Sequence, residues 1–594
     1  MSAAPSDFTS RCAKAAERFL QMVVVIDNQA EFDAPRTHPP QLAHMAQTTL
    51  SGSPAVPEVI PDPAVTQEED ISPAGSAGQS AAEQEVTSDA QVSGVAESVA
   101  ETDGEEHFGH ELDAKALTDA FGDRNILCTI YRPAPGENMV ERSGRIASHA
   151  DVVIVDWILE HQSSSKAKEI IADILRRDNE RNGRLRLIAV YTGQAGMPAL
   201  ARELFDHLTN AAGLSGLSLG SEDEAVLLGP NARIVFLAKA GSRLGQSLGG
   251  VAVADVPGRL ITEFTKLNSG ILPSIALQSI AAIREATHHI VATFHSGLDA
   301  ALVLHRCLLP SPEDAVPFAV ELVAAELGEI LRVEDIGGGF AGVDATKEWL
   351  QMARPEGANL KIGQTIVTHA QLHHFLEKGK SGGEHANIPG AGGKKARETL
   401  GEILYGESGV AKSRCLELSR ISILKREAYG RRSLPPLKPP ALSLGTIVKP
   451  LPNERGEMPG GLEADTFLLC TQPVCDAVRI NGQRKFPFQR AVRSDSPFNV
   501  VVKLQDKTEA TLHVDGFPYM TEMFTFRCTP PVLGAVVAEV SGGRYVFRDV
   551  DGNQFEWLAD LKELVAQFMV SSLGARFASV GMDLFEWLRQ QAKT

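Results

Sequence analysis

The sequence predicts an α/β fold with a doubly wound parallel sheet in its first 255 residues. Short, continuous apolar runs rich in β-branched residues alternate there with stretches of helical periodicity. Such runs are typical of strands buried on both faces, and their alternation with helices indicates a parallel sheet covered on both sides. The runs expected to form strands are 22–26, 126–131, 152–155, 185–191 and 233–238.

The segments between these runs define the rest of the first unit. Apolar residues at helical spacing predict helices at about 6–20, 138–148, 165–179 and 197–210. The first strand is followed by a segment, about 34–108, that is rich in Pro, Ala, Ser, Gln and Glu and poor in large apolar residues. Such a composition cannot bury enough apolar surface to offset its ordering entropy, so we expect a disordered acidic insert.

The remainder of the chain is predicted to form a helical region followed by a β-rich domain. Residues 256–440 are expected to form a mainly helical region, and the Pro-rich stretch 435–440 marks its end. Residues 441–594 are expected to form a β-rich domain with C-terminal helices. Helices are expected at 271–294, 298–308, 315–331 and 558–589, and late strands at 467–470, 477–480, 498–503, 511–514 and 545–547.

The net charge of -18 is concentrated in one place. No Lys or Arg occurs between Arg36 and Lys115, and 15 Asp and Glu residues lie there, so the rest of the chain is close to neutral. No basic face for nucleic acid is apparent. The seven cysteines form no C-x-x-C pair, and no signal peptide or membrane-spanning run is visible. We therefore expect a cytoplasmic protein that binds neither membrane nor nucleic acid.

Polar residues stand at the carboxyl ends of four predicted strands: Asp27, Asp156, Thr192 and Lys239. In an open parallel sheet this edge is where sites form. A carboxylate such as Asp156 can attack phosphorus, and the charge of a transferred phosphoryl group needs cations. A hard divalent ion between Asp27 and Asp156, together with the ammonium of Lys239, would supply them.

This order of residues resembles the receiver domain of two-component response regulators, which has a flavodoxin-like five-stranded sheet. The resemblance implies that Asp156 accepts a phosphoryl group from a histidine kinase, with Thr192 and Lys239 beside it. It also implies that Asp27, Asp156 and the backbone carbonyl of Ile158 bind Mg²⁺, and that Phe236 is a switch aromatic. An unrelated doubly wound fold is the alternative, because buried runs ending in Asp or Lys are common in α/β proteins.

Two positions depart from the receiver pattern. Asn28 stands where a second acid is usual, so we expect weak Mg²⁺ binding, and Ala240 stands where proline usually follows the lysine. Together with the insert, these departures are similar to the divergent receivers of Detocs-type bacterial anti-phage systems. The stretch ALQSIAAIREATHHI and the ending VGMDLFEWLR are similar to that group as well. That resemblance implies a phosphorelay intermediate or phosphate buffer in antiviral defence, with partners encoded in the same operon.

Two other functions remain open: an effector with an unrecognised enzymatic activity in the C-terminal half, and a scaffold with a degenerate receiver. No output-enzyme motif is apparent. His288 and His289 could take part in phosphotransfer, although a surface pair is the simpler interpretation. The stretch 389–395 lacks the first Gly and the final Ser or Thr of a P-loop. Cys470, Cys475 and Cys528 lack a fourth ligand at zinc spacing, which favours packed thiols.

Overall fold

The computed structural model describes fifteen stretches of the 594-residue chain. They are 7–32, 112–134, 138–160, 163–181, 183–211, 214–240, 250–310, 312–355, 360–362, 365–385, 396–405, 408–430, 439–514, 516–528 and 534–578. The predicted disordered insert at about 34–108, the stretch 389–395 and the expected helical ending after residue 578 lie outside the described residues.

The first unit is built on a sheet with strand order β4-β1-β5-β6-β9-β8-β7. Its first five strands pair in parallel, as the sequence predicted. They are β4 (Leu127–Tyr131), β1 (Met22–Ile26), β5 (Val152–Val155), β6 (Arg186–Thr192) and β9 (Ala232–Ala238). The observed sheet extends beyond the five expected strands: β8 (Val226–Leu228) pairs antiparallel with β9, and β7 (Ser218–Leu219) pairs antiparallel with β8. Both lie in the segment that the sequence presented as a polar loop.

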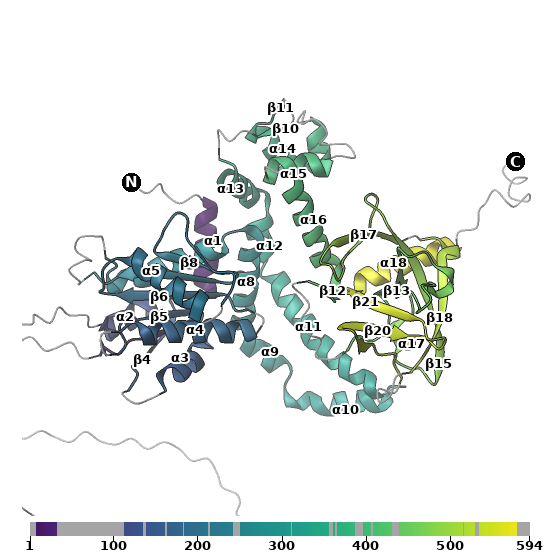
Figure 1. The fold of residues 1–594 in the computed structure, drawn as a ribbon, viewed down its shortest axis with the longest axis horizontal. Coiled ribbons are helices and arrows are strands. Elements are labelled where there is room, and N and C mark those ends of the chain that lie inside the picture. Colours follow the sequence, from purple (N-terminus) through teal and green to yellow (C-terminus); the bar gives the residue numbers. More distant parts are fainter. Residues whose placement is uncertain are drawn as a thin grey trace, which may run out of the picture.

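Helices cover both faces of this sheet because alternate strand residues point to opposite sides. Val23 and Val25 contribute to a core cluster with α1 (Asp7–Phe19), α2 (Ala114–Gly122) and α7 (Val256–Asn268). Val24 and Ile26 contribute to the opposite cluster, where α3, α4 and α5 pack. These helices are α3 (Met139–Ala147), α4 (Ser165–Glu180) and α5 (Met197–Asp206), and α5 continues into the π-helical turn η1 (His207–Ala211). Strands β5 and β6 of this unit and its helices α3, α4 and α5 are labelled in Figure 1.

The two ends of the long insert meet beside the sheet. Strand β2 (Ala30–Glu31) pairs in parallel with β3 (Leu112–Asp113), so that Ala30 faces Leu112 in the register. Asp113 then caps α2 by accepting a hydrogen bond from the backbone N–H of Ala116 at 2.8 Å. Helix α2 was not among the predicted elements, although its apolar residues Leu117 and Phe121 are fully buried.

The middle of the chain is mainly helical, as predicted. Its elements are η2 (Val253–Asp255), α8 (Ile271–Glu285), α9 (Thr287–Thr293), η3 (Ser296–Leu298), α10 (Asp299–Leu308), η4 (Pro312–Asp314), α11 (Ala315–Val333), α12 (Ile336–Ala341), α13 (Val343–Ala353), β10 (Lys361–Ile362), β11 (Thr365–Ile366), α14 (His369–His385), α15 (Ala396–Tyr405) and α16 (Ser408–Ile423). In the described part of the chain, no helix combines the length and apolar character that crossing a bilayer requires.

Helix α1, which belongs to the first unit, forms ion pairs and hydrogen bonds with this helical region. Arg11 forms a two-pronged ion pair with Glu348 of α13, and Arg18 does the same with Glu285 of α8. Arg284 lies with its guanidinium 4.6 Å from the ring centre of Phe19 and donates to the backbone carbonyl of that residue at 2.9 Å. Helix α1 therefore contacts elements that follow it by more than 250 residues.

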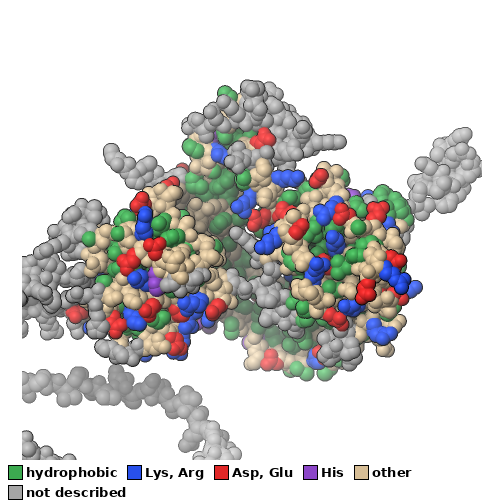
Figure 2. All heavy atoms as spheres, viewed as in Figure 1, with side chains coloured by type: hydrophobic (Ala, Val, Ile, Leu, Met, Phe, Trp, Pro, Cys, Tyr) green, Lys and Arg blue, Asp and Glu red, His purple; other side chains and the backbone are tan. Residues whose placement is uncertain are grey.

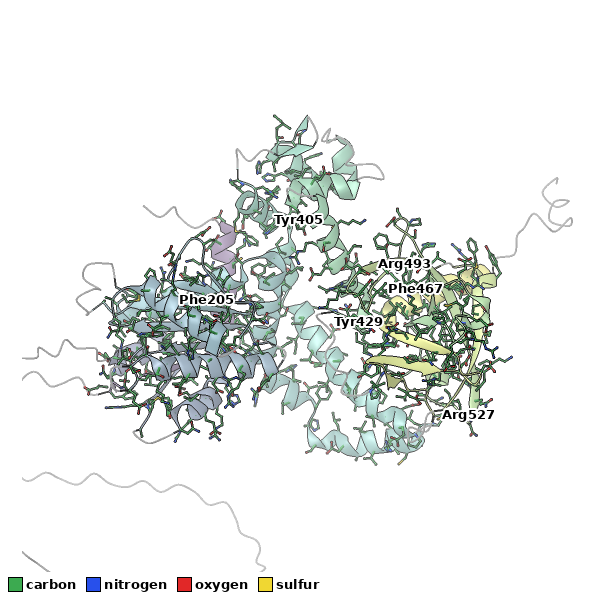
Figure 3. The ribbon with its side chains drawn as sticks, in the orientation of Figure 1. Phe205, Tyr405, Tyr429, Phe467, Arg493 and Arg527 are labelled. Carbon is green, nitrogen blue, oxygen red and sulfur yellow. The ribbon has the colours of Figure 1, made fainter. Side chains whose placement is uncertain are left out.

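The C-terminal part is an antiparallel sheet with α18 beside it (Figure 1). Its elements are β12 (Leu424–Glu427), β13 (Thr446–Leu451), η5 (Pro459–Gly461), β14 (Thr466–Cys470), α17 (Val474–Ala477), β15 (Gln483–Arg493), β16 (Val500–Lys503), β17 (Glu509–Val514), η6 (Pro518–Met520), β18 (Thr521–Arg527), β19 (Glu539–Ser541), β20 (Arg544–Arg548), β21 (Gln554–Leu561) and α18 (Glu563–Ala578). Figure 3 shows Phe467, whose ring lies 5.7 Å from the guanidinium of Arg493, and Tyr429, whose hydroxyl donates to Glu556 at 2.6 Å.

Two predictions for this part were wrong. The strand expected at 477–480 is replaced by the short helix α17, with only Ile480 in an isolated bridge. The helix expected from Leu558 begins later, because Leu558 and Leu561 belong to β21, which is hydrogen-bonded to β13. An almost continuously buried run had been mistaken for a helix, an ambiguity that periodicity alone does not resolve.

Candidate phosphoacceptor site

Backbone pairing brings the polar strand ends of the first sheet to one edge. Asp27 follows β1, Asp156 follows the neighbouring strand β5, and its backbone N–H donates to the carbonyl of Ile26 at 2.9 Å. Thr192 ends β6, and the backbone N–H of Lys239 donates to its carbonyl at 2.9 Å. Parallel strands in register thus place these side chains in adjacent rows of one sheet edge.

Three of the side chains are in direct contact. The Nζ of Lys239 lies 3.1 Å from Asp27 Oδ2 and 3.1 Å from Asp156 Oδ1. Asp27 is 2% exposed, and Asp156 and Lys239 are each 7% exposed. Charged groups buried this deeply are stabilised only when they are paired, so the ammonium holds the two carboxylates in place.

The electrostatics of this triad favour a further cation. Two carboxylates share one ammonium, which leaves an excess negative charge away from water. Burial raises the pKa of Asp156 above its ordinary value; Lys239 opposes this shift, and Asp27 adds to it. Burial alone would lower the pKa of Lys239, but the two carboxylates outweigh burial, and its pKa is raised. The raised pKa of Lys239 keeps its ammonium charged, whereas the raised pKa of Asp156 means that its ionised carboxylate is destabilised by burial.

The oxygen atoms around the triad suit a hard divalent ion. Asp27 Oδ1 accepts from the backbone N–H of Gln29 at 2.7 Å, and Asp156 Oδ2 accepts from that of Ile158 at 2.9 Å. The Oδ1 of Asn28 is buried without a hydrogen-bond partner among the described residues. Asn28 follows Asp27 directly in the chain, and a buried acceptor without a partner is a fitting oxygen ligand for Mg²⁺. Within the described ranges, no group of three or more His, Cys, Asp or Glu side chains is arranged to hold a metal ion.

Thr192 borders the triad from the next strand. It is 1% exposed, and its hydroxyl accepts a hydrogen bond from the backbone N–H of Gln194 at 3.2 Å. The structure thus brings Asp27, Asp156 and Lys239 into hydrogen-bond contact, and it places Thr192 on the adjoining strand end with a local partner.

Three aromatic side chains surround the site. The rings of Trp157 and Phe236 meet edge to face with centroids 5.4 Å apart, and both residues are buried. On the other side, the Nζ of Lys239 lies 5.7 Å from the ring centre of Tyr191. Burial raises the pKa of Tyr191 to about 12, and its hydroxyl donates to the carbonyl of Val251 at 2.8 Å. Sequence reasoning missed Tyr191, although its position directly before Thr192 at a strand end was a usable signal.

The weaker sequence signals lie elsewhere. His289 is on α9, where its Nε2 lies 3.6 Å from Glu326. Cys470, Cys475 and Cys528 belong to the β-rich part, and none of the three forms a disulfide with another described residue. Burial raises the pKa of the Cys470 thiol, which favours the neutral, unreactive form.

Comparison with known proteins agrees with the fold of this unit. The family model described as "Response receiver domain" matches residues 19–244. Comparison with curated proteins and with solved structures gave no match. The parallel sheet, its flanking helices and the family match together support a response-regulator receiver in this part of the chain. The match ends before the helical region begins.

Proposed function

We propose that this protein is a phosphoacceptor of a two-component pathway and that Asp156 takes a phosphoryl group from a histidine kinase. The observation that carries this proposal is the buried contact of one ammonium with two carboxylates at the carboxyl edge of a parallel sheet. A structural ion pair needs one carboxylate for each cation, whereas a second buried carboxylate leaves a negative charge that can hold an incoming divalent cation. That cation, together with Lys239, can then stabilise the negative charge of a phosphoryl group.

The proposed reaction is an in-line transfer. A carboxylate oxygen of Asp156 forms a bond to phosphorus, the P–N bond to the donor imidazole breaks, and the imidazole recovers a proton from solvent. Mg²⁺, held by Asp27, Asp156, the carbonyl of Ile158 and Asn28 Oδ1, would neutralise the phosphoryl oxygens. Lys239 is already within hydrogen-bond distance of Asp156, so it can pass to a phosphoryl oxygen with a small movement.

The position of this protein in its pathway is a further part of the proposal. The resemblance to the receivers of Detocs-type systems supports a relay intermediate or phosphate buffer in anti-phage defence. Its partners would then be a histidine kinase and other proteins of the same operon. We place the boundaries at 1–255 for the receiver, 256–440 for the helical region and 441–594 for the β-rich domain.

Specific observations favour two other functions. Asn28 in place of an acid would suit a scaffold whose receiver has lost its metal. A pocket of about 400 Å³ between α18 and the C-terminal sheet, lined by Gln489, His513, Phe517 and Arg576 among others, would suit an effector with its own ligand. Incorporation of a phosphoryl group would argue against a scaffold with a degenerate receiver. Assaying nucleotides after incubation with the full chain would test for an effector activity.

The test is incorporation of ³²P from labelled acetyl phosphate with Mg²⁺ present. We expect the wild-type chain to be labelled and Asp156→Asn to be unlabelled. Asp206→Asn, which changes an exposed carboxylate on α5 of the same unit, is the matched control and should be labelled like wild type. Undiminished label on Asp156→Asn would place the acceptor elsewhere and overturn the proposal.

A further inference from the structure

Helices α10 and α11 present an apolar surface that no other described part of the chain covers. Ten large hydrophobic side chains, named here the hairpin patch, are exposed on η3, α10 and α11. They are Leu298, Leu302, Val303, Leu304, Leu308, Val316, Phe318, Val320, Leu322 and Val323. Figure 2 shows hydrophobic side chains gathered on these helices at the bottom of the view. Helices that are apolar on every side are ordinarily buried, so a surface of this extent marks an interface.

Helix α11 carries the spacing of a helix–helix seam. Val316, Val320, Val323, Leu327 and Ile330 follow one another at alternating steps of four and three residues. This repeat of 3.5 residues is the one that lines up apolar side chains between paired helices. Val316 and Val320 are 58% and 63% exposed, whereas Leu327 and Ile330 are half-buried. The seam is therefore open along the first half of α11, and its second half lies where α11 contacts α8 and α9.

The charge around this seam indicates what covers it. The positions that flank a seam choose partners by charge, and here Pro317, Ala319 and Ala324 are uncharged. Glu326, a fourth flanking residue, is already beside His289. A charged partner would gain nothing from such flanks, whereas a second copy presents an equally neutral surface despite the chain's net charge of -18.

The area of the hairpin patch also favours a second copy of the chain as its partner. A stable interface buries about 800 Å² on each partner. Ten large side chains that each expose more than a third of their surface approach that area, and one bound peptide helix would cover only one side of α10 and α11. Two hairpins facing each other across a two-fold axis would cover both helices of each copy, as in a four-helix bundle.

We propose that the hairpin patch is a homodimer interface, in which α10 and α11 of two copies pack about a two-fold axis near Val323. This surface lies outside the receiver part of the chain, and the proposal does not depend on phosphorylation. The receiver and the β-rich part would then be held on the outside of the paired hairpins.

Sedimentation velocity of the full chain tests this proposal. We expect a dimer at micromolar concentration. Val320→Glu should raise the dimer dissociation constant by about a hundredfold or more, because a carboxylate would be buried without a partner. Val540→Glu, which changes a valine of similar exposure (70%) on β19, outside the hairpin patch, should leave the constant unchanged. A wild-type chain that stays monomeric, or a dimer that both variants leave intact, would overturn the proposal.

Mixing experiments distinguish self-pairing from loss of folding. Val323→Lys and Val323→Glu should each be monomeric alone and should form a mixed dimer together, because the two-fold axis brings the two positions close to each other. Cys307 on α10 is exposed, so a bismaleimide should cross-link the wild-type dimer. The cross-link should vanish in Cys307→Ser and persist in Cys475→Ser, which removes the exposed thiol of the β-rich part. Monomers in the mixture would contradict the two-fold arrangement.

Discussion

The indole of Trp157 and the ring of Phe236 meet edge to face at 5.4 Å, one residue beyond the proposed acceptor and three residues before Lys239. This contact joins the strand end that would carry the phosphoryl group to the strand that carries the lysine. A movement of Lys239 toward a phosphoryl oxygen would therefore change the surroundings of Trp157 and Phe236, which are both buried.

The first prediction concerns this pair. Phosphodonor should change the fluorescence of Trp157, because a new charge and a shifted Phe236 alter the surroundings of its indole. Phe236→Leu should still accept label but should lose most of the fluorescence change. Trp157→Phe identifies the signal and should show none. A full response in Phe236→Leu would mean that the ring takes no part in the switch.

Lys239 should matter more for the response than for labelling. Lys239→Ala leaves Asp27 and Asp156 buried without their shared cation, which should destabilise the receiver part by about 3 kcal/mol. We expect reduced label and no change in Trp157 fluorescence, whereas Lys239→Arg should retain part of both. Mg²⁺ should restore more stability to Lys239→Ala than to wild type, and equal stabilisation would argue against a shared site.

Metal affinity should depend on residue 28. Asn28 offers one neutral oxygen, so wild type should bind Mg²⁺ weakly. Asn28→Asp should bind about tenfold more tightly, because it adds a third carboxylate to Asp27 and Asp156. Asn28→Leu should bind more weakly than wild type, since the orphaned acceptor is lost. Titration calorimetry measures all three, and identical affinities would place the metal away from Asn28.

The raised pKa of Asp156 predicts how stability depends on pH. Between the ordinary pKa of an Asp, about 4, and its raised value in the fold, the native state binds more protons than the unfolded chain. This contribution to stability is present at low pH and is lost as the pH rises through that window. Asp156→Asn should remove this loss, so the variant should be more stable than wild type at pH 7. Hydrogen exchange of the β5 amides at several pH values would check this, and a destabilised Asp156→Asn would contradict it.

The pairing of β2 with β3 predicts that the insert can be shortened. The ladder holds Ala30 beside Leu112, so the residues left after deletion of 40–105 span the gap easily. For a flexible loop made roughly sixfold shorter, closure entropy favours the fold by about 1.5 kcal/mol. Urea unfolding should show a small gain with ³²P labelling retained. A large loss of cooperative unfolding would show that the insert contributes to the core.

The sequence predicted the five parallel strands because each is a short, mainly apolar run, and four of these runs end at one of the polar site residues. It missed β7 and β8, since strands of two and three residues leave no period to detect. It also missed β15, whose eleven residues include four charged side chains. Pairing with β14, β17 and β18 stabilises that strand, and such partners are invisible in a local pattern.

The site, too, has some features that the sequence predicts and others that only the structure shows. Asp27, Asp156 and Lys239 follow from strand ends alone, because parallel register brings such residues together. The orphaned oxygen of Asn28 and the ring contact of Trp157 with Phe236 depend on side-chain direction. No spacing rule contains that information, so these two features required the three-dimensional arrangement.

Helix α1 has a consequence for how the protein is made. Arg11 and its partner Glu348 are 337 positions apart. At about 5–20 residues per second, a ribosome needs on the order of 20–60 s to deliver the partner after the arginine has emerged. The apolar face of α1, with Phe8 and Phe19, therefore waits for α8 and α13 while the intervening chain is still being translated. Until those helices are made, the first helix of the nascent chain exposes apolar side chains that are buried in the finished fold.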